Sequence, residues 1–131
     1  MKVLMPIKRN RLGMTLMEMI IVVVLIGILA TVGAVGYRKT VEQARQKEAR
    51  SMLRLIQHAE EVRRLEMNTY VACADTAACN TALHLDLPAG DWAYSVTASG
   101  NASFCAQALS ANFGNFSINN GTADPTANGC S

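Results

Sequence analysis

The residues best suited to chemistry are four cysteines in the second half of the chain, Cys73, Cys79, Cys105 and Cys130. All four follow a long apolar segment, a placement that indicates an oxidising compartment, in which disulfides persist. Four cysteines allow three pairings, and the sequence does not choose among them, although the local arrangement of Cys73 with Cys79 and Cys105 with Cys130 is favoured. A zinc site is the alternative, but the spacings lack the paired cysteines and nearby histidines that structural zinc needs.

A single acid, Glu18, lies at the front of the apolar segment. Residues 19–37 form a run of 19 residues without a charge, close to what one bilayer crossing needs. A charge at the edge of hydrocarbon costs about 2.5 to 3.5 kcal/mol on insertion scales, so this acid needs a partner or a purpose. Thr15 and Glu18 fit the S/T-x-x-E capping box, and a carboxylate also suits the positive end of a helix dipole.

Composition and charge limit the classes of function. The chain has 131 residues, of which 50% are hydrophobic and 17% charged, and this excludes a disordered protein. The net charge of +2 combines +4 in residues 1–13, +2 in residues 14–68 and −4 in residues 69–131, where there is no Lys or Arg. This last region, about 63 residues long, is too small for a large enzyme core. Without cations it is also a poor candidate for binding nucleic acid.

The residues around Glu18 resemble the cleavage and assembly signature of type IV pilins and of the related pseudopilins of type II secretion. The matching segment runs Gly13-Met14-Thr15-Leu16-Met17-Glu18 and continues into an apolar run. The resemblance implies that a membrane-embedded prepilin peptidase cuts between Gly13 and Met14 and methylates the new amino terminus. Once cut, Met14 carries a cationic amine. Neighbouring subunits could then pair the Glu18 carboxylate of one with the Met14 amine of the next, which fixes their register.

A single long helix is predicted to carry this site. No proline interrupts residues 14–67, so a helix of roughly 54 residues, about 80 Å long, is expected. Its front half must contact lipid first and neighbouring subunits later. In its second half, apolar residues recur at helical spacing and predict one continuous face, with Glu48 as its only charge. The residues of this face are Tyr37, Val41, Ala44, Met52, Leu55, Ile56, Ala59 and Val62.

A small β-rich head is predicted after the helix, beginning with a loop over residues 68–90. Alternating apolar residues around Trp92, Phe104 and Phe116 predict a three- or four-stranded antiparallel sheet that packs on the second half of the helix. The fold class is therefore α+β, and Phe113 is expected in the third strand. The predicted parts are a leader at 1–13, a transmembrane and assembly half at 14–37, an amphipathic half at 38–68 and a disulfide-bonded head at 69–131.

These expectations favour a structural protein over an enzyme. His58 and His84 have no second ligand set nearby and are expected to be solvated or packed, and no cofactor or metal is predicted. The chain is expected to wait in the bacterial inner membrane with its head in the periplasm. There it meets the prepilin peptidase and the pilus assembly machinery, and it then polymerises with itself into an extracellular filament for adhesion, motility or DNA uptake.

Two alternatives remain open. The first is a pseudopilin of a type II secretion or competence system. The second belongs to a different class: a secreted disulfide-bonded binding module whose ordinary signal peptide is cleaved near Ala34. One observation predicts the opposite membrane orientation, because six cations follow the apolar run within about 20 residues, against four in the leader.

Overall fold

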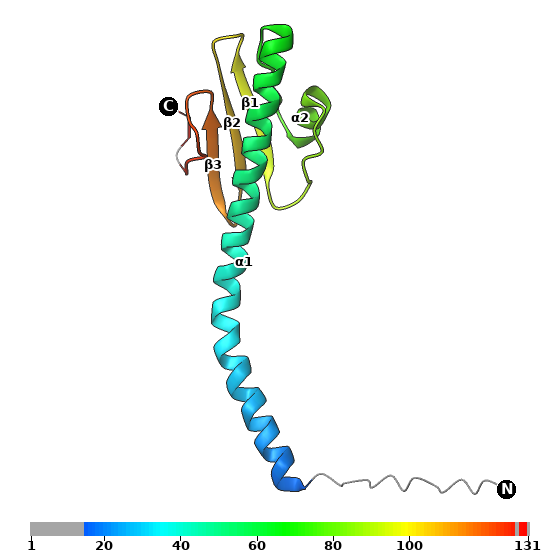
Figure 1. Cartoon of the computed structure of the whole chain (residues 1–131), viewed down its shortest axis with the longest axis vertical. Coiled ribbons are helices and arrows are strands. Elements are labelled where there is room, and N and C mark those ends of the chain that lie inside the picture. The colour runs from blue at the N-terminus through cyan, green and yellow to red at the C-terminus, as the bar shows by residue number, and fades with distance from the viewer. Residues whose placement is uncertain (1–14, 128, 131) are drawn as a thin grey trace, which may run out of the picture. The chain divides into compact units, whose positions relative to one another are not determined.

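A computed structural model describes residues 15–127, 129 and 130 of the chain (Figure 1). The chain divides into two compact units, Met1–Lys39 and Thr40–Ser131, which are described separately. Helix α1 (Leu16–Met67) has 52 residues and contributes to both. It ends where Asn68 takes a left-handed conformation with φ of 55° and its N–H bonds to the Arg64 carbonyl at 2.8 Å. Asparagine tolerates this conformation and is a frequent helix terminator.

Three strands form an antiparallel sheet in the second unit, in the spatial order β1-β2-β3; their bounds are β1 Ala93–Ser99, β2 Ser103–Ser110 and β3 Gly114–Asn119. The register aligns Val96 with Ala106 and Ala106 with Ile118, and all three side chains are buried. The α+β fold class with an antiparallel sheet is confirmed. Phe113, which was expected in the third strand, lies instead in the turn before β3.

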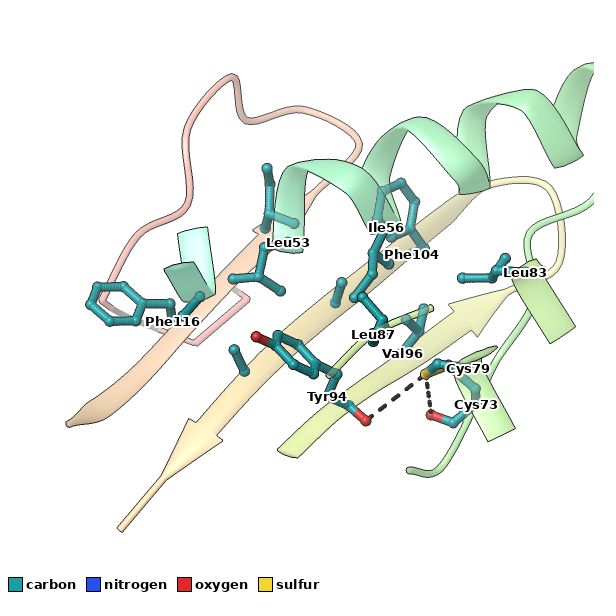
Figure 2. Packing of buried hydrophobic residues seen from close by; sticks show 14 of the residues in the cluster. Leu53, Ile56, Cys73, Cys79, Leu83, Leu87, Tyr94, Val96, Phe104 and Phe116 are labelled. Carbon is teal, nitrogen blue, oxygen red and sulfur yellow. Dashed lines mark hydrogen bonds between the residues drawn. A yellow bond between two sulfur atoms is a disulfide. The ribbon is translucent and has the colours of Figure 1, made fainter. Parts of the chain in front are cut away.

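The core of the second unit lies between α1 and one face of the sheet (Figure 2). Leu53 and Ile56 of α1 are fully buried, and Tyr94 of β1 is only 1% exposed. Aromatic packing extends this core, since the ring centres of Trp92 and Phe116 lie 5.8 Å apart. The sheet therefore packs on the second half of α1, as the sequence predicts.

The face of α1 that packs on the sheet differs from the predicted apolar face. Ile56 is buried as expected, but Leu55 and Val62 are 43% and 53% exposed. The buried face contains two polar residues, Gln57 at 8% exposure and Glu60 at 0%; its members are Ala49, Leu53, Ile56, Gln57 and Glu60. Apolar spacing alone misplaced this face because Gln57 and Glu60 are buried through hydrogen bonds to backbone groups of the head. The predicted stripe overlaps this buried face, because Ile56 is in the core and Met52 and Ala59 pack against it, whereas Leu55 and Val62 lie on the adjacent, partly uncovered face.

The segment predicted as a loop over residues 68–90 contains a second helix, α2 (Thr76–Leu83). Asp75 caps its first turn, because the carboxylate accepts a hydrogen bond from the Ala78 N–H at 2.8 Å. His84 ends it in a left-handed conformation with φ of 54°. Cys79 is fully buried on its inner side. The prediction of a continuous loop was wrong because an eight-residue helix depends on its caps and on Cys79 rather than on a long apolar period.

Two disulfides hold the segments that cover the two edges of the sheet. Cys73 pairs with Cys79, and Cys105 pairs with Cys130, which is the local arrangement favoured from the sequence. Cys73 also exchanges two backbone hydrogen bonds with Val96 at the outer edge of β1. Thr126 does the same with Ser117 at the outer edge of β3, four residues before Cys130. Unpaired strand edges attract other chains, so these bridges limit unwanted sheet pairing.

Candidate functional site

The candidate site begins at the start of α1. The Glu18 N–H donates to the Thr15 carbonyl at 3.1 Å and to the Thr15 Oγ1 at 3.3 Å, and the Met19 N–H donates to the same carbonyl at 3.3 Å. Thr15 therefore satisfies N–H groups that a helix start otherwise leaves unpaired. Gly13 and Met14, the two residues of the predicted cleavage site, lie outside the described residues.

The Glu18 carboxylate takes no part in these hydrogen bonds. Only half of the predicted capping box forms, because within residues 15–127, 129 and 130 no hydrogen bond or ion pair reaches the Glu18 side chain. The side chain is exposed in the first turn of α1, where the positive end of the helix dipole favours an acid. Among the described residues, no cation lies beside this carboxylate.

The first half of α1 presents an uncovered apolar surface. The large aliphatic and Met side chains between Leu16 and Val32 are between 39% and 79% exposed. The helix is long enough and apolar enough to cross a membrane, and none of its apolar window is buried by the described part of the chain. Such a surface is stable only against lipid or another protein, since water makes its exposure costly.

Comparison with known protein families gives one match. Residues 8–34 match the family model of the prokaryotic N-terminal methylation motif. The chain carries the class III signal of type IV pilins and pseudopilins. No curated protein and no solved structure matches the chain. For this pilin-like chain, the signal implies processing by a prepilin peptidase and subsequent assembly, and the apolar helix is consistent with membrane anchoring beforehand.

Two ion pairs between the second half of α1 and the head were not predicted. Arg45 Nε lies 3.3 Å from Asp91 Oδ2, and its Nη1 lies 3.1 Å from Glu48 Oε2. Arg54, the residue after the core residue Leu53, pairs with Asp124 of the C-terminal segment. The charges of the two regions do not show which residues meet. These exposed pairs orient the head on α1 more than they stabilise it.

Glu60 of α1 holds the start of the head and was also missed. Its side chain is fully buried, and Oε2 accepts a hydrogen bond from the Val71 N–H at 2.9 Å. Its Oε1 has no hydrogen-bond partner among the described residues. Burial raises the pKa of Glu60 above its ordinary value of 4.5, against the opposing effects of the Val71 hydrogen bond and the nearby Arg63. Nothing in the sequence distinguishes this acid from its exposed neighbours.

The raised pKa predicts that Glu60 makes the second unit less stable as the pH rises. Glu60 binds its proton more tightly in the folded state than in the unfolded state. Its contribution to the free energy of unfolding is therefore fully present below pH 4.5 and is lost as the pH rises through the folded-state pKa of Glu60. We expect Glu60→Gln to flatten the pH dependence of the melting temperature, because the glutamine side chain does not titrate. Thermal unfolding between pH 4 and 8, with the exposed Glu66→Gln as control, checks this; an unchanged slope in Glu60→Gln would contradict it.

The histidines and cysteines do not form a metal centre in the described part of the chain. His58 is exposed, with Nδ1 3.7 Å from Glu61 Oε2, and His84 ends α2. No group of three potential ligands comes together among the described residues. All four cysteine sulfurs are used in disulfides, so the zinc alternative has no ligands from them.

Proposed function

We propose that the protein is a structural subunit of a type IV pilus that polymerises through α1 into an extracellular filament. The observation that carries this proposal is the methylation motif at residues 8–34, placed directly on an apolar helix that the described chain leaves uncovered. A subunit that is stored in lipid and later transferred to a polymer needs two features. It needs a processing signal at this position, and it needs an apolar surface that a partner can cover.

The physical sequence of events follows from the residues. In the bacterial inner membrane, residues 19–37 lie in the hydrocarbon and the head lies in the periplasm, where its disulfides form. Cleavage after Gly13 leaves a cationic amine on Met14, four residues before the Glu18 carboxylate. In the filament, each Glu18 pairs with the amine of a neighbouring copy, so that neither charge stays alone in an apolar bundle. The apolar side chains exchange lipid contacts for contacts with other copies.

The second half of α1 also supports a polymer. After the sheet has covered Leu53 and Ile56, the adjacent face still exposes Leu55, Val62 and Leu65, at 43%, 53% and 86%. A helix that is apolar on two faces needs a partner on each. The sheet covers one face, and neighbouring subunits would cover the other.

Two other functions compete with this one. A pseudopilin of a secretion or competence system would use the same signal and helix, and it differs in forming a short periplasmic fibre rather than a surface filament. A secreted binding module would lose the apolar helix by cleavage near Ala34. An enzymatic role is not proposed, and the absence of Lys and Arg from residues 69–131 disfavours direct binding of DNA by the head.

Mass spectrometry of the mature amino terminus tests the proposal. We expect the membrane-associated chain to begin with N-methylated Met14, and we expect Gly13→Glu, which places a charged side chain at the cleavage point, to retain the leader. Sheared surface fibres should contain the processed chain if it is a pilin. A mature chain beginning near residue 35 would support the secreted module instead, and a processed chain absent from surface fibres would favour the pseudopilin.

A further inference from the structure

Charges in the second unit are only partly compensated within one chain. Asp91 and Asp124 of the head pair with arginines of α1. Asp86 is exposed and has no ion pair among the described residues. Asp75 is also exposed, and it caps α2 without an ion pair among the described residues. Both acids flank α2 (Thr76–Leu83), and we call Asp75, α2 and Asp86 the acidic border. The head has no Lys or Arg that could neutralise it.

Three cations and one histidine lie along one side of α1. Lys47, Arg50, Arg54 and His58 recur at spacings of three and four residues, which places them on one side of the helix, and Arg54 already pairs with Asp124. They line a shallow hollow together with the side chains of Ser51, Met52 and Leu55, and we call this surface the basic groove. Lys47 is exposed and has no acidic partner among the described residues, and Arg50 lies over the Phe116 ring at 4.8 Å without one.

The arginines of the basic groove and the acidic border lie on different sides of α1, although Leu55 and His58 of the groove also line a second hollow with Leu83, His84 and Leu85. The basic groove adjoins β3 and the C-terminal segment, through the contacts of Arg50 with Phe116 and Arg54 with Asp124. The acidic border lies on the other side, where Arg63 donates to the Ala82 carbonyl of α2 at 3.0 Å. Figure 1 likewise shows β3 and α2 on opposite sides of α1. Each surface therefore remains available to another molecule.

We propose that the basic groove of one copy binds the acidic border of a second copy within the filament. This inference depends on the proposed function. The partner is the same chain because it supplies the missing charge of each surface. A contact between two different surfaces does not close on itself, so its repetition generates an open helical assembly rather than a dimer. Exposed ion pairs are individually weak, but complementary surfaces exclude wrong registers and orient the incoming subunit.

Charge reversal in the full chain tests this contact. We expect Lys47→Glu and Asp86→Lys each to lower the yield of sheared filaments roughly tenfold, because each places like charges opposite one another. We expect the chain carrying both changes to recover to within about twofold of the wild type, since every contact regains opposite charges. Cleavage of the leader and thermal unfolding of the head should stay unchanged in all three variants.

Two control variants each add one charge, of the same sign as in the reversals, away from the proposed surfaces. Ala102→Glu adds an acid to the exposed turn between β1 and β2, and Ala111→Lys adds a cation to the exposed turn between β2 and β3; both should assemble like the wild type. Normal filaments from either single reversal, or a combined variant that stays defective, would overturn the contact while leaving the proposed function intact. A wild-type chain that never enters filaments would overturn the proposed function and this contact with it.

Discussion

Glu18→Ala is expected to leave cleavage after Gly13 intact and to abolish incorporation of the chain into filaments. The hydrogen bonds that start α1 use the backbone N–H of Glu18, which alanine retains, so the substitution removes the carboxylate alone. Removing one partner of a buried ion pair costs about 3 to 5 kcal/mol, because the other charge stays desolvated and unpaired. That cost corresponds to roughly a hundredfold or more in an association constant. Filament yield and the mass of the processed chain measure both outcomes.

Two controls separate the proposed pairing from helix capping and from net charge. Thr15→Ala removes the Oγ1 that accepts from the Glu18 N–H and should cost about 1 kcal/mol at the helix end while assembly continues. Glu42→Ala removes an exposed acid farther along α1 and changes the net charge equally. If Glu18→Ala chains formed normal filaments, the carboxylate would be no more than a favourable charge at a helix end.

The parts of the molecule that sequence analysis predicted are those that local pattern determines. An uninterrupted apolar run predicts α1, and the alternation around Tyr94, Phe104 and Ile118 predicts strands, because each element carries its own period. The methylation motif is likewise a contiguous signal, so it could be recognised without a structure and matches residues 8–34. The cleavage at Gly13 and the pairing of Glu18 stay predictions.

The features that sequence analysis missed depend on contacts between residues far apart in the chain. Gln57 is buried because its Nε2 donates to the carbonyls of Asn119 and Thr122, both at 3.0 Å, more than 60 residues away. Glu60 is buried against the Val71 N–H. Neither partner can be identified from apolar spacing, so the predicted face of α1 left out these two polar positions and included the exposed Leu55 and Val62. The pairing of Arg54 with Asp124 was hidden for the same reason.

The second large expected effect is on the stability of the head, and it differs between two leucines of α1 that are two residues apart. Leu53 is fully buried against the sheet, whereas Leu55, which belongs to the predicted apolar face, is 43% exposed. We expect Leu53→Ala to lower the free energy of unfolding of the head by about 3 kcal/mol, through lost burial and the cavity left behind. For a head of this size the melting temperature should fall by about 4 to 8 °C per kcal/mol. Leu55→Ala should cost less than about 1 kcal/mol.

The same pair distinguishes folding from assembly. Leu55 lies on the face that the sheet leaves uncovered, so Leu55→Ala should keep a folded, processed chain. It should still reduce filament yield, because the exposed part of the Leu55 side chain is covered when neighbouring copies pack on it. Near-ultraviolet circular dichroism of the full chain in detergent, followed on heating, measures the first property, and sheared filament yield measures the second. If Leu53→Ala and Leu55→Ala lowered the melting temperature equally, the sheet would have to pack on the apolar stripe predicted from the sequence. That stripe would then be unavailable to other subunits.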